Sequence, residues 1–395
     1  MEKEKKVILK KGPGAQNALW HPWIYRSQIG EISGSPSPGD RLSVYGPHKR
    51  FIGAGTFNPK SEIVVRILSR TPAPWDKSFF KERIGAAMEH RARWVTDTNA
   101  CRVVAGEADG LPGLIVDRYD EVLVVQFLTM GMEKLKGAVL EALGEAIPNR
   151  GIYEKSDSVS RKWEGLEPRT GWIQKDCGDE ATVREGGVRY KINFGEGHKT
   201  GLYLDQRENR FLLANLGIKG DALDAFCYQG GFGLHLALGG CRVLGIDIQE
   251  SAIKEAKANR DLNGIPPEKM DFRTANVFDE LKALQKEGRR FDLVILDPPS
   301  FVKKKSALEG AAAGYKEILL RAMKLLNEKG CLAVFACSHH VDENLLMQCS
   351  LSAAHDVRKD LRVLKFMKQS ADHPINPFIP ETYYLKGFLF SVSSQ

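Results

Sequence analysis

The C-terminal half of the chain alternates short apolar runs with longer segments of helical, amphipathic periodicity. The apolar runs predict strands over residues 221–226, 242–248, 271–274, 291–296 and 331–336. Helices are predicted between them, for example over 251–263 and 314–326. This alternation is typical of a doubly wound parallel sheet. The runs at 362–368 and 384–392 have no helix between them, so we expect an antiparallel final strand.

The N-terminal half has a different pattern, in which short strands are separated by turns rich in glycine and proline. This pattern predicts a small β-barrel over residues 1–74. Mixed helical and strand patterns then predict a central α+β domain over 75–185, followed by a hairpin that reaches about residue 198. The Rossmann-like domain covers 199–395. The fold class is therefore α/β, with a barrel and a central α+β insert before the doubly wound sheet.

Composition places the chain among ordinary globular proteins, with 43% hydrophobic and 27% charged residues. No apolar run approaches the roughly 20 residues that span a bilayer, and the N-terminus does not resemble a signal peptide. Seven cysteines without a Cys-x-x-Cys pair predict a reduced, cytoplasmic protein without disulfides. Zinc bound by Cys331, Cys337, His339 and His340 is an alternative, but their spacing matches no common ligand set, so we expect no metal.

Positive charge is concentrated near the N-terminus. Residues 1–79 contain 13 Lys or Arg and 6 Asp or Glu, which accounts for the net charge of +7 of the whole chain. A basic module attached to a neutral body indicates a polyanionic partner such as RNA, because neutralising phosphates provides affinity for any sequence. The alternative is a solvated basic surface without a partner.

The first strand of the C-terminal domain runs into a glycine turn. Residues 224–231 read Asp-Ala-Phe-Cys-Tyr-Gln-Gly-Gly, and glycines at this place let the backbone approach a ligand at the start of the next helix. Asp224 could accept from a cationic amine. Asp247 ends the second strand, where an acid commonly binds ribose hydroxyls. Alone, this pattern also fits a dehydrogenase or an ordinary tight turn.

Two later strand ends carry reactive groups. The strand over 291–296 is followed by Asp297-Pro-Pro-Ser-Phe, and the strand over 331–336 is followed by Cys337. Carboxyl ends of parallel strands share one crevice, so a carboxylate and a thiol are expected at one site. A thiolate there could add to an electron-poor ring such as C6 of cytosine, which turns C5 into a nucleophile. The alternative is that Cys337, like the other six cysteines, is a buried small apolar residue.

The combination resembles the cytosine-C5 methyltransferases of large-subunit ribosomal RNA, over nearly the whole chain. The resemblance is carried by residues 21–23, 53–59, 110–119, 199–210, 297–301, 336–338 and 372–374, by Glu381, and by residues 384–387. It implies a PUA-like RNA-binding domain over 1–74 and an S-adenosylmethionine-dependent methyltransferase domain over 199–395. Structured RNA, in particular large-subunit ribosomal RNA, is then the expected partner, with no role for a membrane. A homodimer is one hypothesis for the oligomeric state.

The resemblance also implies roles for individual residues. Cofactor contacts are expected at Gln206, Arg207, Asp224, Phe226, Gly230, Asp247, Asn276 and Asp297. Substrate contacts are expected at Pro298, Pro299, Phe301 and His373. Cys337 is the expected nucleophile, and Asp297 is expected to hydrogen-bond the base near N3. Asn276 stands where many relatives carry an acid near the adenine amine, and its carbonyl oxygen can still accept. Asp205 and Arg207 could instead form an ion pair at a helix start.

One departure from the family pattern limits the mechanism. Many RNA cytosine-C5 enzymes carry a second cysteine after the first proline of the Asp-Pro motif, whereas Pro299 and Ser300 stand here. A single-cysteine mechanism is therefore expected, and Asp297 or a water could remove the C5 proton. The alternative functions are methylation of another base atom such as a guanine nitrogen, methylation of a small molecule, and a non-catalytic RNA-binding factor.

Overall fold

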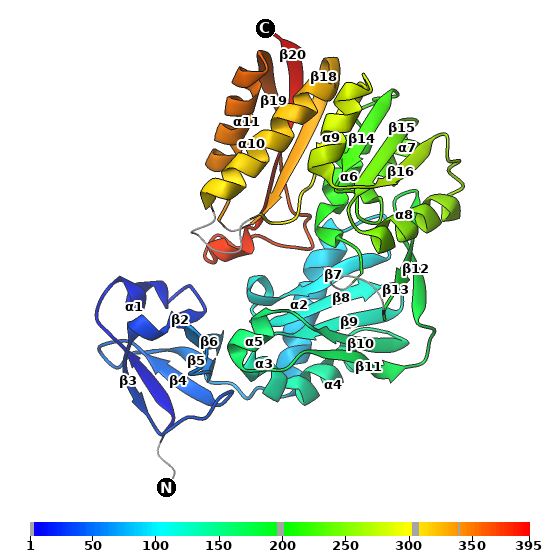
Figure 1. Cartoon of the computed structure of the whole chain (residues 1–395). Coiled ribbons are helices and arrows are strands. Elements are labelled where there is room, and N and C mark those ends of the chain that lie inside the picture. Colours follow the sequence, from blue (N-terminus) through cyan, green and yellow to red (C-terminus); the bar gives the residue numbers. More distant parts are fainter. Residues whose placement is uncertain (1–3, 196–200, 302–307, 339) are drawn as a thin grey trace. The chain divides into compact units, whose positions relative to one another are not determined.

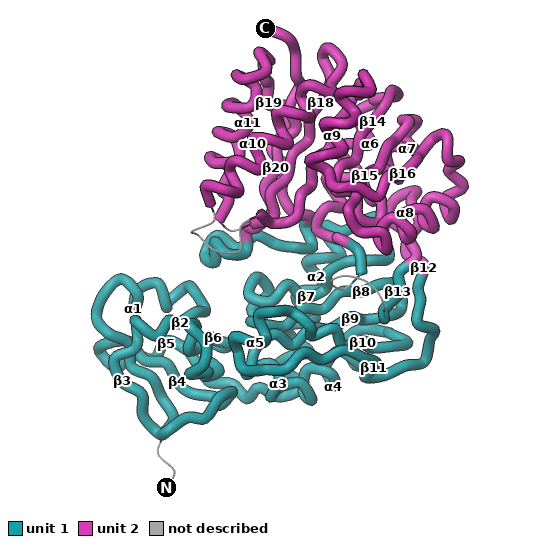
Figure 2. Tube along the Cα trace, in the orientation of Figure 1, with its two compact units in different colours: residues 1–181, 192–202, 371–382 teal, residues 182–191, 203–370, 383–395 magenta. Residues whose placement is uncertain are grey.

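The computed structural model describes residues 4–195, 201–301, 308–338 and 340–395. The chain divides into two compact units, each made of several segments (Figure 2). Unit 1 comprises residues 1–181, 192–202 and 371–382. Unit 2 comprises residues 182–191, 203–370 and 383–395. Within the described ranges, no helix combines the length and the apolar character that a membrane crossing requires.

The N-terminal part of unit 1 is a six-stranded sheet with the order β2-β6-β5-β4-β1-β3 (Figure 1). The strands are β1 (Lys6–Leu9), β2 (Trp23–Tyr25), β3 (Ile29–Ser33), β4 (Arg41–Tyr45), β5 (Phe51–Phe57) and β6 (Ile63–Ser69). All neighbouring strands are antiparallel except β1 and β4, which are parallel. A short helix, α1 (Pro13–Asn17), lies between β1 and β2. Apolar side chains from β1, β2, β4, β5 and β6 form one core cluster.

The central part of unit 1 is a five-stranded sheet with the order β11-β10-β9-β8-β7. The strands are β7 (Ala100–Ala105), β8 (Leu114–Tyr119), β9 (Val122–Phe127), β10 (Gly151–Ser156) and β11 (Arg169–Lys175). The helices are α2 (Lys77–Trp94), α3 (Met130–Lys134), α4 (Lys136–Ala146) and α5 (Ser160–Glu164). The Asp76 side chain caps α2 by accepting from the Phe79 amide. The expected α+β mixture is therefore present.

Unit 2 contains a seven-stranded sheet with the order β16-β15-β14-β17-β18-β20-β19. The strands are β14 (Asp221–Ala225), β15 (Arg242–Asp247), β16 (Met270–Thr274), β17 (Phe291–Leu296), β18 (Leu326–Cys337), β19 (Lys359–Lys368) and β20 (Leu385–Ser394). The pairs among β14 to β18 are parallel, whereas β20 runs antiparallel to both β18 and β19. The predicted doubly wound sheet with an antiparallel final strand is confirmed.

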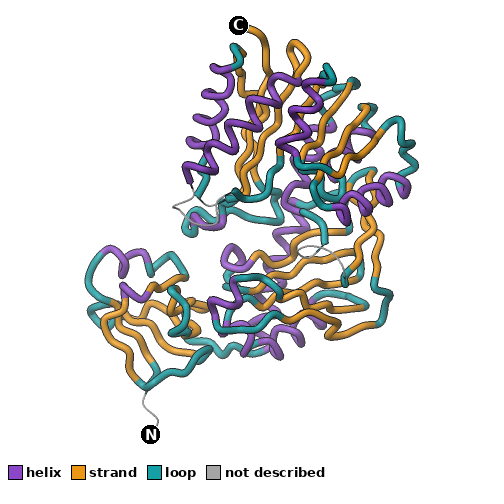
Figure 3. The backbone as a smooth tube through the Cα atoms, in the orientation of Figure 1, coloured by secondary structure: helices purple, strands orange, loops and turns teal. Residues whose placement is uncertain are grey.

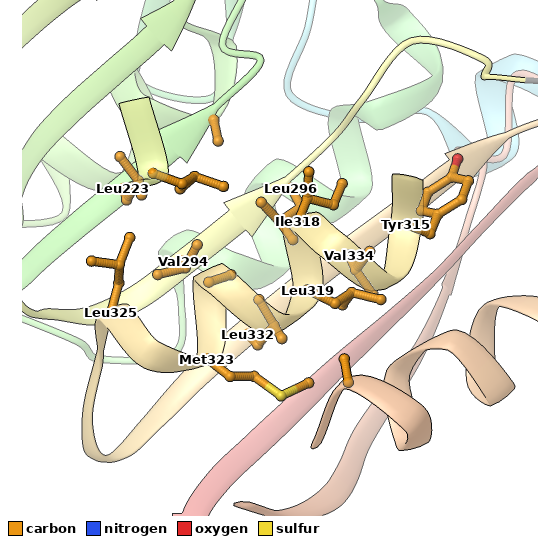
Figure 4. Close-up of a cluster of buried hydrophobic side chains, with 14 of the residues drawn as sticks. Leu223, Val294, Leu296, Tyr315, Ile318, Leu319, Met323, Leu325, Leu332 and Val334 are labelled. Carbon is orange, nitrogen blue, oxygen red and sulfur yellow. The ribbon is translucent and has the colours of Figure 1, made fainter. Parts of the chain in front are cut away.

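Helices cover both faces of this sheet (Figure 3). They are α6 (Arg207–Ala214), α7 (Gly231–Leu238), α8 (Glu250–Leu262), α9 (Val277–Lys286), α10 (Leu308–Leu325) and α11 (Glu343–Asp356). Figure 4 shows the cluster on one face, where strand residues such as Val294 and Val334 pack against Ile318 of α10. On the other face Phe335 of β18 stacks on Phe232 of α7, with ring centroids 5.4 Å apart. Burial on both faces explains the continuous apolar runs of β17 and β18.

The two units cut across the domain boundaries expected from the sequence. The hairpin of β12 (Glu180–Glu185) and β13 (Val188–Asn193) contributes residues 182–191 to unit 2. Residues 371–382 belong to unit 1, although the sequence before and after them belongs to unit 2. Buried polar contacts hold this segment in unit 1: Arg91 donates to the Asp372 carbonyl, and the Arg102 amide donates to the Asp372 carboxylate.

Candidate active site

The turn after β14 has backbone conformations that are unusual outside glycine. Phe226 and Tyr228 have φ angles of 65° and 49°, and Gly230 has a φ of 80°. Left-handed conformations at non-glycine residues cost of order 1–3 kcal/mol each and cluster at ligand sites. A Cβ atom at Gly233, in the first turn of α7, would lie 2.5 Å from Cε of Met270. Because the glycine turn follows directly on β14, it places this strained backbone at the carboxyl end of that strand.

Asp224 lies on β14 just before this turn and is fully buried. Its Oδ2 atom accepts a hydrogen bond from the Gly233 amide at 2.9 Å. Among the described residues its Oδ1 atom has no hydrogen-bond partner. Burial raises the pKa of Asp224 to about 7, because the charged form loses its hydration and the Gly233 bond offsets only part of that cost. A buried carboxyl group with an open oxygen fits a cationic amine, which the methionine part of S-adenosylmethionine carries.

Asp247 ends β15 and supports the same turn. One carboxylate oxygen accepts from the Tyr228 amide at 3.0 Å, and the other accepts from the Gln249 amide at 2.9 Å. Each oxygen keeps a further lone pair, so the carboxylate can still accept from ribose hydroxyls. Asn276 caps α9, since its side-chain oxygen accepts from the Phe278 amide at 2.9 Å. The expected role of Asn276 near the adenine would use the second lone pair of that oxygen.

Asp297 follows β17 and is joined to the segment that precedes α6. The side-chain nitrogen of Gln206, Nε2, donates to Oδ2 of Asp297 at 3.1 Å. Gln206 is itself held, because its side-chain oxygen accepts from Asn209 at 2.6 Å. The next residue, Arg207, is buried at the start of α6. The structure thus brings together Gln206 and Asp297, which lie 91 positions apart in the sequence, and fixes the orientation of the carboxylate.

Cys337 is the last residue of β18 and is partly exposed. Its Sγ atom lies 3.8 Å from the carbonyl oxygen of Pro298, the residue after Asp297. The thiol and the Asp-Pro-Pro segment therefore lie side by side, as the sequence predicts. Burial raises the pKa of the thiol in four of the other cysteines, three of which are buried and one, Cys331, partly exposed. These four are Cys227, Cys241, Cys331 and Cys349.

Two tyrosines that the sequence analysis did not single out lie near Cys337 and Asp297. Burial raises the pKa of Tyr203, and the negative charges of Tyr228, Asp297 and Cys337 raise it further. Burial also raises the pKa of Tyr315 of α10, again with contributions from Cys337 and Asp297. Within the described part of the chain, the Tyr315 hydroxyl has no hydrogen-bond partner. Tyr203 lies in the segment 199–210, which carried the family resemblance, so the sequence offered a signal for it. Tyr315 lies outside every segment of that resemblance.

Lys386 fixes the backbone next to Cys337. Its side chain is buried, and its Nζ atom donates to the carbonyl oxygens of Ser338 and Tyr383, both at 3.1 Å. Burial lowers the pKa of Lys386, while Asp342, Glu343 and Cys337 act in the opposite direction. Because Ser338 directly follows Cys337, this lysine ties the end of β18 to the start of β20.

A buried ionic cluster lies behind the glycine turn. Glu185, at the end of β12, binds Arg210 of α6 through two contacts of 2.6 Å and His235 of α7 through one of 2.9 Å. Burial alone would raise the pKa of Glu185, but Arg210 and His235 outweigh it and lower that pKa to about 2. Arg210 also donates to the Tyr203 carbonyl at 3.0 Å. The hairpin therefore supports α6 and α7, the second of which begins at the glycine turn.

The expected substrate residues are distributed over both units. Pro298 is buried, Pro299 is exposed, and Phe301 packs against Tyr315 with ring centroids 4.9 Å apart. His373 belongs to unit 1, where it is buried and lies 3.1 Å from the Asp372 carboxylate. His373 is thus not grouped with the unit 2 residues. His339, considered above as a zinc ligand, and residues 199–200 of the family pattern lie outside the described residues.

Solved structures share this architecture. A Streptococcus mutans protein provisionally described as an S-adenosylmethionine-dependent methyltransferase has a TM-score of 0.84 at 18% identity, over 98% of this chain and 99% of that chain. A further structure, of a methyltransferase complexed with SAH, also has a TM-score of 0.84, at 17% identity and the same coverage. At these identities the likeness concerns the fold.

Sequence comparisons are more specific. Residues 151–390 match the S-adenosylmethionine-dependent methyltransferase family model, and residues 7–70 match a PUA-like domain. The "Ribosomal RNA large subunit methyltransferase I" of Pseudoalteromonas atlantica is 38% identical over 386 residues, covering 96% of this chain and 98% of the relative. The Vibrio cholerae protein of the same name is 37% identical over 392 residues, covering 98% and 99%. S-adenosylmethionine is therefore the cofactor, and the chain belongs to the ribosomal RNA large subunit methyltransferase I family of S-adenosylmethionine-dependent methyltransferases.

Proposed function

We propose that this protein methylates C5 of a cytosine in large-subunit ribosomal RNA, through a covalent bond between Cys337 and C6 of the base. The observation that carries the proposal is the position of Cys337, whose Sγ atom lies 3.8 Å from the carbonyl of Pro298 at the edge where the cofactor turn also lies. The relatives named for large-subunit ribosomal RNA support the substrate class. The basic N-terminal region supports a polyanionic substrate.

The proposed reaction begins at the thiolate of Cys337. It forms a bond to C6, and the electrons of the C5–C6 double bond shift toward C4 and N3. The ring is then an enamine in which C5 is nucleophilic. When bound, S-adenosylmethionine supplies the methyl group from its sulfonium centre. C5 takes up this methyl group, the C5 proton then leaves to a base, and the bond between sulfur and C6 breaks. The products are 5-methylcytosine, S-adenosylhomocysteine, the protonated base and the regenerated thiolate of Cys337.

Asp297 has the role of a hydrogen-bonding group at the ring edge near N3. In its protonated form Asp297 would donate to N3, which withdraws electron density from C6 and favours attack by the thiolate. The hydrogen bond from the Gln206 side chain holds one oxygen of Asp297 in place, which supports a fixed orientation of this carboxyl group toward the base. Pro299 and Ser300 occupy the positions where a second cysteine would stand, so Asp297 or a water accepts the C5 proton in this scheme.

The cofactor is proposed to bind along the carboxyl ends of β14 to β16. Asp224 would accept from the amine of the methionine part of the cofactor. The protein backbone at Phe226 and Gly230 would lie against that same part. Asp247 would bind the ribose hydroxyls, Asn276 would accept from the adenine amine, and Arg207 would add a positive charge. The unpartnered Oδ1 atom of Asp224 supports this arrangement, because a buried oxygen without a partner indicates an absent ligand donor.

The substrate must expose its base, since a stacked and paired cytosine cannot present C6 to a thiol. Pro298, Pro299 and Phe301 are proposed to line the base pocket, and His373 is proposed as a further contact. The PUA-like domain would hold the surrounding structured RNA by its shape and backbone. A cytoplasmic location is part of the proposal, because that is where ribosomal RNA and reduced thiols occur together.

The decisive experiment is transfer of labelled methyl groups to protein-free large-subunit ribosomal RNA, with mass spectrometry of the nucleosides. Wild-type protein is expected to form 5-methylcytosine, and Cys337→Ala is expected to form none. Cys331→Ala is the matched control, because Cys331 lies on the same strand, is also partly exposed, and has a thiol whose pKa is raised by burial. Undiminished activity of Cys337→Ala would refute the covalent mechanism. Label recovered as a methylguanosine would replace the proposal with guanine-nitrogen methylation.

A further inference from the structure

Unit 1 carries an exposed pair of stacked aromatic rings. Trp20, in the turn after α1, has 64% of its surface exposed, and Phe378, in segment 371–382, has 60% exposed. Their ring centroids lie 5.3 Å apart with planes at 18°. These residues are far apart in the sequence and bury little area against the rest of the unit. The outer faces of both rings therefore remain open to solvent, which is unusual for large aromatic side chains.

The backbone that carries the two rings is fixed by polar contacts. The Arg70 guanidinium donates to the carbonyls of Ala18 and His21, on either side of Trp20, at 2.5 and 3.1 Å. His21 also lies 2.8 Å from the Glu381 carboxylate, at the far end of the segment that carries Phe378. The rings are therefore held in position before any ligand binds, which reduces the entropy that binding would cost.

The loop beneath Phe378 is also closed on itself. The Phe378 amide donates to the Asn376 side chain at 3.0 Å, and the Asn376 amide donates to the Thr382 hydroxyl at 2.8 Å. Asn376 and Ile379 form an isolated β-bridge. Both halves of the aromatic pair thus stand on a backbone with its own hydrogen bonds.

The surroundings of the pair favour an anionic ligand that has flat rings. Within the described part of the chain, Arg70 forms no ion pair with a carboxylate, and the two carbonyls use two of its five N–H donors. Glu381 is an acidic residue of the segment that carries Phe378, and its carboxylate contacts the His21 ring. The aromatic row continues from His21 to Trp23 and Tyr25, with centroid distances of 5.2 and 6.4 Å. Residues 1–79 are strongly basic.

We propose that Trp20 and Phe378 form a stacking platform for an unpaired base of the RNA substrate, with Arg70 facing the adjoining phosphate. Proteins recognise unpaired RNA by stacking its bases on aromatic side chains beside positive charge, and this pair offers both. A protein partner is disfavoured, because the exposed surface is two ring faces beside a cation and not a broad apolar patch. The platform rests on the proposed RNA substrate, and it adds a binding site formed by residues of unit 1, whereas Cys337 belongs to unit 2.

The test is the affinity of the full-length protein for protein-free large-subunit ribosomal RNA, measured by filter binding at fixed salt. Trp20→Leu keeps apolar bulk but removes the ring face, and Phe378→Ala removes the second ring. Each is expected to weaken binding about tenfold, the usual effect of losing one stacked base. Trp163→Ala is the matched control, because Trp163 is 70% exposed on α5 of the same unit, and its affinity is expected to change less than about twofold.

Trp20→Phe separates stacking from folding, since it keeps a ring at this position and is expected to retain most of the affinity. Thermal melting of each variant checks that unit 1 is intact. Equal affinity of Trp20→Leu, Phe378→Ala and wild type would overturn the platform while leaving the proposed methyl transfer untouched. Absence of binding by the wild type would overturn the RNA substrate and the platform together.

Discussion

At the residue scale, the chemistry of the site depends on a few side chains whose environment changes their protonation. Asp224 is the main example, because its buried carboxyl group has a pKa of about 7 in the protein without ligand. Between pH 3.8 and 7 the folded state therefore keeps a proton on Asp224 that the unfolded state has already released. For this reason Asp224 lowers the free energy of unfolding as the pH rises through that interval. A bound ammonium group would reverse the preference by favouring the carboxylate.

We therefore predict that S-adenosylmethionine binds more weakly as the pH falls below about 7, because binding must then displace the Asp224 proton. The expected loss of affinity approaches tenfold per pH unit. Isothermal titration calorimetry in buffers of different ionisation enthalpy would measure both the affinity and the released proton. Asp224→Asn should bind weakly and without this pH dependence. A wild-type affinity that is constant between about pH 5.5 and 7 would contradict the assignment.

Tyr315 gives a second residue-scale prediction, because its buried hydroxyl lies near Cys337 and Asp297 without a partner in the described residues. Tyr315→Phe is expected to leave the free energy of unfolding unchanged or higher, since it removes an unsatisfied polar atom. Methyl transfer is expected to fall roughly tenfold, if this hydroxyl donates to the bound base. Denaturant titration and single-turnover transfer would measure the two effects.

Tyr119→Phe is the control for Tyr315→Phe. Tyr119 is equally buried, but its hydroxyl accepts from the Leu202 amide at 3.2 Å. Its removal should therefore cost about 1–2 kcal/mol of stability. A comparable loss of stability in Tyr315→Phe would show that the Tyr315 hydroxyl has a partner within the protein.

At the element scale, the hairpin of β12 and β13 is coupled to the sheet of unit 2 through one buried carboxylate. Glu185 is 1% exposed and neutralises Arg210, which is 2% exposed. Its pKa of about 2 lies below the usual 4.5, so its contribution to stability is fully present above pH 4.5 and is lost as the pH falls toward 2. The hairpin thereby fixes α6 and α7, the helices next to the glycine turn.

We predict that Glu185→Ala lowers the free energy of unfolding by roughly 3–5 kcal/mol at neutral pH, because it leaves the Arg210 charge buried without its carboxylate. Glu145→Ala is the matched control. Glu145 pairs with Lys77 and Lys81 on the surface, where such pairs contribute little, so its loss should leave the free energy of unfolding almost unchanged. Urea denaturation at neutral pH would measure both. Similar losses in the two variants would contradict the structural role of the hairpin.

At the scale of the whole molecule, the chain passes between the two units several times. Residues 182–191 and 371–382 each leave the unit of their sequence neighbours. The units are therefore not consecutive domains, and a single cut cannot separate them without removing part of a core or an ion pair. This organisation also places Phe378 of the proposed platform only a few residues before β20, which pairs with the Cys337 strand.

We predict that a fragment of residues 203–395 is unstable, because it lacks Glu185 and leaves Arg210 and His235 without their partner. The fragment 182–395 restores the hairpin and should be recovered in soluble form at a higher yield, with a higher melting temperature. Expression of both fragments followed by circular dichroism melting would compare them. Equal stability of the two fragments would show that the hairpin is dispensable for unit 2.

The sequence alone determined the strands and helices and the reactive side chains at the strand ends. Continuous β-branched runs indicated strands buried on both faces, and these became β14, β15, β17 and β18. The missing helix near the C-terminus indicated the antiparallel β20. Because strand ends are visible as abrupt changes in polarity, Asp297 and Cys337 could be placed at one edge of the sheet. These features depend on local periodicity, which a sequence displays directly.

Only the tertiary structure decided which distant residues meet. Tyr315 lies on a helix whose apolar pattern explains its burial, so nothing local distinguishes it from an ordinary core residue. The burial of the Lys386 side chain depends on carbonyl oxygens that only the fold brings to it. The contacts of Gln206 with Asp297, Glu185 with Arg210, and Trp20 with Phe378 join positions separated by 25 to 358 residues. Such contacts follow from how helices and strands pack in three dimensions, and no periodicity records them. The sequence thus specified the elements and the reactive groups, whereas packing decided their partners and the division into units.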